Sequence, residues 1–189
     1  MTNAELAILS LVAQRPRHGY EIEQVIEARG MREWTEVGFS SIYYLLKKLE
    51  RKGYVQPQQV AAERGPARKV YHITPAGEKA VDESALDALS VPRRCYQQFI
   101  LGLAILPRIG HKDVLNSLGK YQTDLHARRE SMQIRLERQR PLPYFVEAMF
   151  DYSLTLVSAE IDWVEKFIQQ LQSLEGNTKD HEEAKDGEN

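Results

Sequence analysis

The sequence predicts a mainly α protein, in which an N-terminal winged helix-turn-helix with a two-stranded wing precedes an all-helical C-terminal dimerisation domain. Two observations predict this fold class. In the first 90 residues, three helical patterns are followed by two β-prone segments and a fourth helical pattern, the order of elements in a winged helix-turn-helix. From Val91 onward the periodicity is helical throughout. We therefore expect a DNA-binding domain over residues 1–90, a helical domain for dimerisation and ligand sensing over 91–175, and a disordered acidic tail over 176–189.

The composition is that of an ordinary globular protein and excludes few classes. The 189 residues, of which 42% are hydrophobic, suffice to bury a core, and the net charge of -2 does not by itself indicate a nucleic-acid partner. The charge is unevenly distributed, with seven basic and two acidic residues between Ser40 and Lys69, and six acidic residues against two lysines from Glu175 onward. The sequence has no apolar run of the roughly 20 residues that a membrane span needs and no secretory signal, so we expect a cytoplasmic protein that binds no membrane.

The first two helices are predicted from their caps and breaks. Asn3 is suited to cap a first helix, which must end before the Arg-Pro pair at 15–16 because the residue before a proline avoids helical backbone angles. That helix is apolar on nearly all sides, so we expect it to be buried. A second helix begins at the His-Gly-Tyr segment 18–20 and ends at Gly30, a residue type that is common at helix C-termini.

The third helix has the clearest pattern in the chain. Ser40 or Ser41 is expected to cap it, and Gly53 to end it. Apolar residues at spacings of three and four form one narrow stripe for packing on the domain, namely Ile42, Leu45, Leu46 and Leu49. The opposite face and its flanks are basic, hydroxylated and aromatic, and comprise Ser40, Ser41, Tyr43, Tyr44, Lys47, Lys48 and Arg51.

A change from helical to alternating periodicity predicts the wing. The segments 54–60 and 69–73 are β-prone and are separated by the turn-forming run 63–66, so we expect a hairpin. A Thr-Pro pair at 74–75 then suits the N-cap and first position of a fourth helix through about Ala88. Positive charge gathers around the hairpin turn at Arg64, Arg68 and Lys69.

These features together predict a surface that binds double-stranded DNA. A helix enters the major groove when one face packs on its domain and the other offers donors to phosphates and base edges, and a wing meets the neighbouring minor groove or backbone. The predicted DNA-binding residues are His18, Tyr20, Ser40, Ser41, Tyr43, Tyr44, Lys47, Lys48, Arg51, Arg64, Arg68 and Lys69. His18 could equally contact a phosphate or stabilise the turn before the second helix. Taken alone, the third helix could also be a core helix with a solvated lysine face.

The C-terminal half is predicted to contain three helices, over about 92–106, 111–140 and 142–174, separated by proline and glycine breaks. Apolar residues recur through the last helix at spacings of three and four. A seam of that length favours burial against a second copy of the chain, although the two preceding helices could cover part of it. The predicted dimerisation residues are Phe145, Met149, Tyr152, Leu156, Trp163, Phe167 and Leu171. The aromatic ones could instead line a ligand pocket, but residues at helical spacing are more typical of a dimer core.

Other classes of function have little support in the sequence. It contains no phosphate-binding glycine loop, no HExxH motif and no nucleophile elbow, so it predicts neither an enzyme nor a cofactor. The first alternative to DNA binding is a winged-helix module that docks an acidic protein. The second is a metal-sensing repressor, for which only His111 with Asp113 and the segment 181–183 offer loosely spaced ligands, and the sequence predicts no metal site.

Three stretches of the sequence match a known family pattern: LAILSLVAQRPRHGYEI, FSSIYYLLKKLERKGYV and RGPARKVYHITPAGEKAV. With them the chain resembles the longer form of the PadR family of bacterial transcriptional regulators over essentially its whole length. The resemblance implies that Tyr43 matches a tyrosine that contacts DNA, and that the segment 74–77 is a structural TPAG signature. Ser40 and Tyr44 replace the family's usual glycine and proline, so no operator preference carries over. The resemblance also implies a homodimer held by the C-terminal helices, usually a repressor, which in some members is released by a small-molecule effector.

Overall fold

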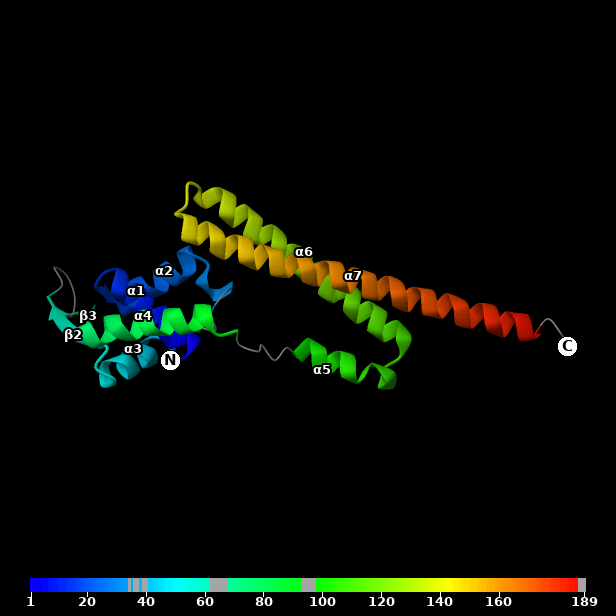
Figure 1. Ribbon diagram of the computed structural model, residues 1–189, viewed down its shortest axis with the longest axis horizontal. Coiled ribbons are helices and arrows are strands. Elements are labelled where there is room, and N and C mark those ends of the chain that lie inside the picture. The colour runs from blue at the N-terminus through cyan, green and yellow to red at the C-terminus, as the bar shows by residue number, and fades with distance from the viewer. Residues whose placement is uncertain (34, 36–37, 39–40, 62–67, 93–97, 187–189) are drawn as a thin grey trace. The chain divides into compact units, whose positions relative to one another are not determined.

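The computed structural model describes residues 1–33, 35, 38, 41–61, 68–92 and 98–186, with side chains described through residue 174. The chain divides into two units, residues 1–95 and 96–189, each of which is described by itself. The first unit contains α1 (Asn3–Gln14), β1 (Arg17–His18), α2 (Gly19–Ala28), the 3-10 helix η1 (Met31–Glu33), α3 (Ser41–Arg51), β2 (Val55–Val60), β3 (Arg68–Ile73) and α4 (Pro75–Ser90) (Figure 1). The second contains α5 (Gln98–Ala104), the 3-10 helix η2 (Leu106–Arg108), α6 (His111–Gln139) and α7 (Tyr144–Asp186). The predicted fold class, a winged helix followed by helices, is confirmed.

The core of the first unit forms around α1, which packs against α2, α3, α4 and β3. The buried apolar residues come from every major element except α4, and they are Ala7, Ile8, Leu9, Leu11, Val12, Ile22, Ile26, Ile42, Leu45, Leu46, Leu49, Val55 and Tyr71. Burying one Leu or Ile side chain contributes about 1.5–3 kcal/mol, so a cluster of this size stabilises the unit by itself. The apolar stripe predicted for the third helix therefore lies in the core, and its opposite face is left outside.

The sheet has three strands in the order β1-β3-β2, one more than the sequence predicted. β2 and β3 form the expected antiparallel hairpin, with Val55 opposite Ile73 and Val60 opposite Arg68. The added strand β1 pairs with β3, so that His18 lies opposite Val70. A strand of two residues between a proline and a helix start has no alternation that a sequence pattern could reveal. Its effect is to attach the start of α2 to the wing.

One helix cap differs from the predicted one, and a second is the predicted residue with an additional contact. Thr2, and not Asn3, caps α1: the Thr2 hydroxyl accepts from the backbone N–H of Glu5 at 3.2 Å, and the Glu5 carboxylate accepts from the Thr2 N–H at 2.9 Å. Thr74 caps α4 as predicted and also donates to the carbonyl of Gly53 at 2.6 Å. A β-carbon on Gly77 would collide with the carbonyl oxygen of Tyr54, so this glycine allows α4 to approach the turn that follows α3. The structural role expected for the TPAG segment is seen in these contacts.

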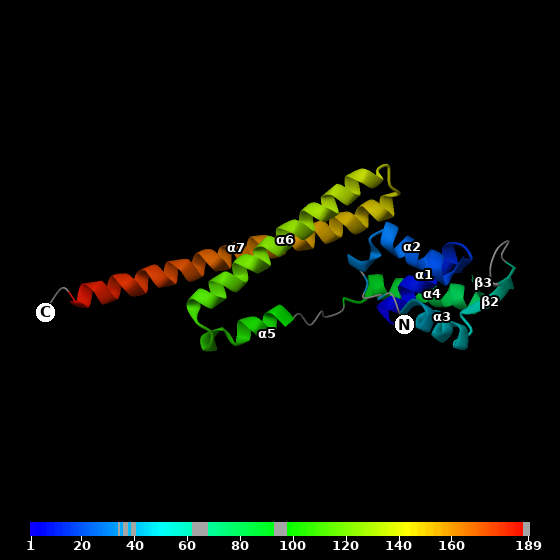
Figure 2. The same ribbon diagram turned by 180° about the vertical axis from the view of Figure 1, so that it is seen from behind.

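The second unit is built on the antiparallel pair α6 and α7 (Figures 1 and 2). The buried cluster between them consists of Leu125, Met132, Val157, Ile161 and Val164, against which Phe99 packs from α5. Tyr121 of α6 donates a hydrogen bond to the carboxylate of Glu160 on α7. Burial and this hydrogen bond raise the pKa of Tyr121 to about 12, which keeps its hydroxyl protonated as a donor.

The helix bounds in the second unit differ from those predicted at both ends. The described part of the first predicted helix is the shorter α5 followed by η2, in which Pro107 stands in the first turn. At the other end α7 continues to Asp186, beyond the predicted helix end near residue 174. No described helix is long and apolar enough to cross a membrane.

Candidate nucleic-acid interface

The exposed face of α3 carries the side chains that the sequence assigned to DNA. Tyr43 and Tyr44 are 58% and 59% exposed, which is unusual for such large side chains, and Lys47 and Arg51 are exposed one and two turns further along. The opposite residues, including Leu46 and Leu49, are fully buried. Large aromatic rings at the helix start and cations towards its end thus lie on one side of a helix that is anchored on the other side.

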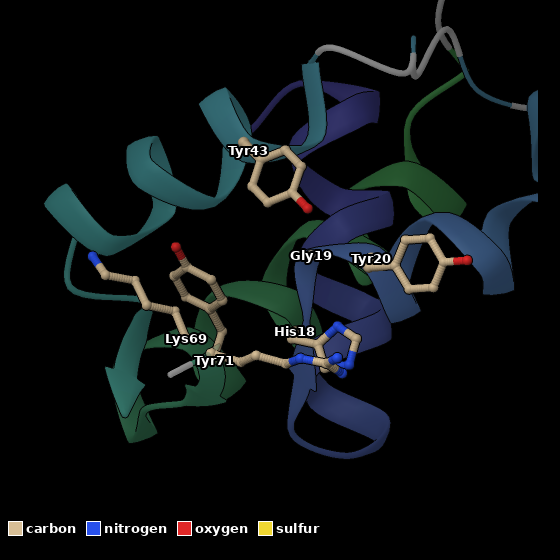
Figure 3. Close-up of a pocket in the computed structure, with 7 residues that line it drawn as sticks. His18, Gly19, Tyr20, Tyr43, Lys69 and Tyr71 are labelled. Carbon is tan, nitrogen blue, oxygen red and sulfur yellow. The ribbon is translucent and has the colours of Figure 1, made fainter. Parts of the chain in front are cut away.

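Three elements from distant parts of the sequence meet at a pocket beside Tyr43. It has a volume of about 490 Å³ and is lined by His18, Gly19, Tyr20, Tyr43, Arg68, Lys69 and Tyr71 (Figure 3). The first three come from the β1–α2 junction, Tyr43 from α3, and the last three from β3. The pairing of β1 with β3 and the packing of α2 on α3 hold these elements together. The lining combines cationic groups, hydroxyl donors and aromatic rings, which are the groups that proteins use for phosphates and sugars.

Tyr71 and Gly19 line the pocket but were not among the predicted DNA-binding residues. Tyr71 is 7% exposed, and its burial raises the pKa of its hydroxyl, with a further rise from the nearby carboxylate of Glu50. The hydroxyl is therefore a neutral donor over the physiological pH range. A signal was present in the alternation of segment 69–73, which places Tyr71 on the same face as Lys69.

His18 caps α2, which was one of the two roles that the sequence left open. Its Nδ1 accepts from the backbone N–H of Glu21 at 3.2 Å, and the Glu21 carboxylate accepts from the backbone N–H of His18 at 3.0 Å. This reciprocal arrangement is a capping box with histidine in place of serine or threonine. It fixes the backbone at the pocket edge, and the remaining ring nitrogen lies 3.6 Å from the same carboxylate.

Lys48 forms an ion pair within the domain, unlike its exposed neighbour Lys47, although both were predicted to bind DNA. The ammonium of Lys48 lies 3.2 Å from the carboxylate of Glu5, and Lys52 donates to the same oxygen at 2.7 Å. Glu5 is only 1% exposed, and burial alone would raise the pKa of its carboxyl. The hydrogen bonds from Lys52, Thr2 and Lys48 outweigh burial and lower that pKa to about 2. The three side chains form an ionic clasp that joins the start of α1 to α3.

The remaining predicted site residues have different outcomes. Arg68 and Lys69 are exposed on β3, and Tyr20 is 56% exposed beside His18. Ser41 donates to the carbonyl of Gly38 at the start of α3. Ser40 and Arg64 lie outside the described residues. Within the described part of the chain, no three His, Cys, Asp or Glu side chains gather as they would around a metal ion.

Comparisons with known proteins relate this chain to transcriptional regulators. The sequence profile of the transcriptional regulator PadR-like family matches residues 8–83. An uncharacterized protein of Lysinibacillus sphaericus is 30% identical over 76 residues, which make up 40% of this chain and 69% of that protein. Bacillus subtilis PadR in complex with operator DNA aligns with a TM-score of 0.73 and 17% identity, over 88% of this chain and 98% of that one. In its complex with p-coumaric acid the same protein aligns with a TM-score of 0.72 and 17% identity, over 89% of this chain and 98% of that one.

Another solved protein with a similar fold is described as an activator. The Vibrio cholerae virulence activator AphA aligns with a TM-score of 0.74 and 18% identity, over 91% of this chain and 99% of that one. The fold thus defines a winged helix-turn-helix protein with a helical second unit. The chain belongs to the PadR-like family of transcriptional regulators.

Proposed function

We propose that this protein is a sequence-specific DNA-binding regulator that acts as a homodimer on a palindromic operator. The observation that carries the proposal is the convergence of the β1–α2 junction, α3 and β3 on one exposed cationic and aromatic surface around Tyr43. Tyr43 and Tyr44 offer hydroxyls and rings to the major groove, while Lys47 and Arg51 neutralise phosphates on its edge. Arg68 and Lys69 are exposed on the wing strand β3, and we expect them to contact the neighbouring DNA backbone.

The dimer is supported by an apolar stripe along α7 that is largely open, although Phe99 of α5 packs edge-on against Trp163 within the chain. The predicted dimerisation residues lie on one side of the helix, where Phe145, Met149, Tyr152, Leu156 and Trp163 are each 43% exposed or more. Phe167 and Leu171 continue the stripe and are partly buried. Soluble proteins seldom leave a contiguous apolar stripe in water, so a second copy of the chain is the occupant we propose. Two copies related by a two-fold axis would present two copies of α3, which fits a palindromic site.

Repression is the mode of regulation that we propose. A dimer that covers two half-sites in a promoter occupies DNA that polymerase needs, and this requires no further contact. In a reporter assay, expression of the chain should lower transcription from the promoter it binds. AphA is described as an activator, and a rise in reporter output would show the same for this chain while leaving the proposed DNA binding intact.

A small-molecule effector is a second proposal, favoured by an apolar pocket in the helical unit. It has a volume of about 240 Å³ and is lined by Phe99, Gly102, Leu103, Leu106, Ile109, Val114, Ser117, Leu118 and Tyr121. B. subtilis PadR has been solved with p-coumaric acid, a small aromatic compound of suitable size. We expect p-coumaric acid or a related aromatic to release the protein from DNA, and the pocket-filling variant Gly102→Leu to resist release. Release that is identical in both proteins would place the effector elsewhere.

Selection from fragmented genomic DNA tests the main proposal. The full chain should enrich a palindromic motif, and the logarithm of its binding constant should fall with the logarithm of salt concentration, with a slope of about -0.9 per phosphate neutralised. Selection without an enriched motif would contradict sequence-specific binding and favour a winged-helix module that docks an acidic protein. Elemental analysis of untagged protein would test the metal-sensing alternative.

The neighbouring lysines of α3 provide a matched pair within this experiment. Lys47→Gln should weaken binding to specific and random DNA alike and reduce the salt slope by about one, because a phosphate contact is lost. Lys48→Gln should leave the salt slope unchanged and lower the melting temperature, because its ammonium already pairs with Glu5. The reverse pattern would reassign Lys48 to the DNA surface.

A further inference from the structure

We infer that Gly19 is a positioning residue for DNA binding: its missing side chain forms the seat on which the ring of Tyr43 packs (Figure 3). A β-carbon at Gly19 would lie 2.5 Å from Cε1 and 2.9 Å from Cζ of Tyr43. Carbon atoms in contact stay at about 3.5–4.0 Å, so any side chain at this position displaces the ring. The inference deepens the proposed function and rests on it, since it concerns how the DNA-binding tyrosine is held.

Backbone strain does not explain a glycine here. Gly19 is the first residue of α2, and the positive backbone φ angles among the described residues belong to Gly30 and Gly53. Alanine would fit the helical backbone at this position and would favour the helix slightly. The group that excludes a β-carbon is therefore the side chain of Tyr43, which comes from another helix.

The seat is held from both sides, so the ring has to move when a methyl group is added. Just before Gly19, strand β1 pairs with β3, with His18 opposite Val70. Just after it, the reciprocal hydrogen bonds between His18 and Glu21 fix the first turn of α2. In contrast, Tyr43 is 58% exposed, and its outer face has room to rotate into solvent. Displacement of Tyr43 is the least costly response to a side chain at Gly19.

This contact gives an exposed aromatic ring one preferred orientation before DNA arrives. A free ring on a helix surface populates several rotamers and loses that freedom on binding. Packing against Gly19 removes part of this cost and holds the ring at the pocket that Lys69 and Tyr71 also line (Figure 3). Gly19 thereby contributes to affinity without touching DNA.

A double-mutant cycle on the full chain tests this coupling, using the operator obtained by selection. Gly19→Ala should weaken operator binding about tenfold, as should Tyr43→Ala, and the double variant should bind no more weakly than Tyr43→Ala alone. The melting temperature of Gly19→Ala should equal or exceed that of the unmodified protein. The control is Gly119→Ala in α6, where a β-carbon meets nothing within 4 Å, and it should leave DNA binding unchanged.

Three results would overturn the inference: unchanged binding by Gly19→Ala, losses that multiply in the double variant, or a lowered melting temperature that explains the weaker binding. A DNA-independent readout separates this failure from that of the proposed function. In NMR spectra, the α-protons of Gly19 should carry a ring-current shift that disappears in Tyr43→Leu. If the chain selects no DNA motif but shows this shift, the proposed function is wrong and the packing of Tyr43 on Gly19 stands. If the shift is absent, the packing itself is wrong.

Discussion

The two units of the molecule bury their apolar surfaces to different extents. In the first unit, α1 is surrounded by helices and the sheet, and apolar side chains such as Ile8, Leu46 and Ile22 are fully buried within one chain. In the second unit, α7 has two apolar faces. Val157, Ile161 and Val164 are buried on the face towards α6, while the face bearing Tyr152 and Leu156 is open.

This difference indicates which unit is complete by itself. A closed core that includes the anchored side of α3 gives a rigid scaffold on which exposed rings and cations can be aimed at DNA. A long helix with an open second face gives a surface whose burial depends on another molecule. We therefore propose that the self-contained unit recognises DNA and that the open unit mediates assembly, and each of the following experiments tests this proposal.

The largest effect is expected from a charge on the open face of α7. Leu156→Glu should convert the protein to monomers and weaken operator binding about 100-fold or more, because two linked α3 helices bind far more tightly than one. Sedimentation velocity reports the oligomeric state, and fluorescence anisotropy with operator DNA reports affinity. Gln169→Glu adds the same charge to an exposed position on another side of α7 and should change neither. A Leu156→Glu protein that stays dimeric would show that the open stripe serves another purpose.

A matched pair of Leu→Ala substitutions gives the next largest effect. Leu46→Ala should cost about 2–5 kcal/mol in the free energy of unfolding at every protein concentration, because it leaves a cavity in the closed core. Leu156→Ala should cost much less in dilute protein and more as concentration rises, because Leu156 is 52% exposed until a partner covers it. Urea denaturation at two protein concentrations measures both. A loss for Leu156→Ala that does not vary with concentration would argue that α7 packs within its own chain.

The elements that the sequence predicted well are those whose pattern repeats. Helix α3 has a strong apolar stripe and glycine at its end, and α4 begins with a threonine and proline, so both were located from local chemistry alone. The open stripe of α7 was also identified by its spacing. The second stripe on the same helix, towards α6, was not separated from it, since a helix that is apolar on two sides gives no single seam to follow.

The features that the sequence could not reveal depend on contacts between distant segments. Strand β1 is too short to have a pattern, and it exists because β3 offers it a free edge. The proximity of Gly19 to Tyr43 follows from how α2 packs on α3. Glu5 gave a weak signal as an acid in an otherwise apolar helix, but its partners Lys48 and Lys52 lie more than 40 residues away in the chain. Such pairings require the tertiary fold.

The smallest effect concerns the ionic clasp of the closed unit. Glu5→Gln should cost about 1–3 kcal/mol in the free energy of unfolding at neutral pH, because the buried carboxylate holds the ammonium groups of Lys48 on α3 and of Lys52 just after it. The folded-state pKa of Glu5 lies below its usual value of 4.5, so its contribution is present above pH 4.5 and is lost as the pH falls towards 2. The difference in stability between the unmodified protein and Glu5→Gln should therefore shrink over that interval.

The exposed ion pair of α4 supplies the control for this last prediction. Lys79 and Glu83 lie 3.7 Å apart with both side chains more than two-thirds exposed to solvent, so water and salt screen their attraction. Glu83→Gln should change the stability by less than about 0.5 kcal/mol at any pH. Chemical denaturation of the three proteins between pH 2 and 7 measures both effects. Equal losses for Glu5→Gln and Glu83→Gln would mean that burial of the clasp adds nothing to the anchoring of α3, and its rigidity would then rest on the apolar stripe alone.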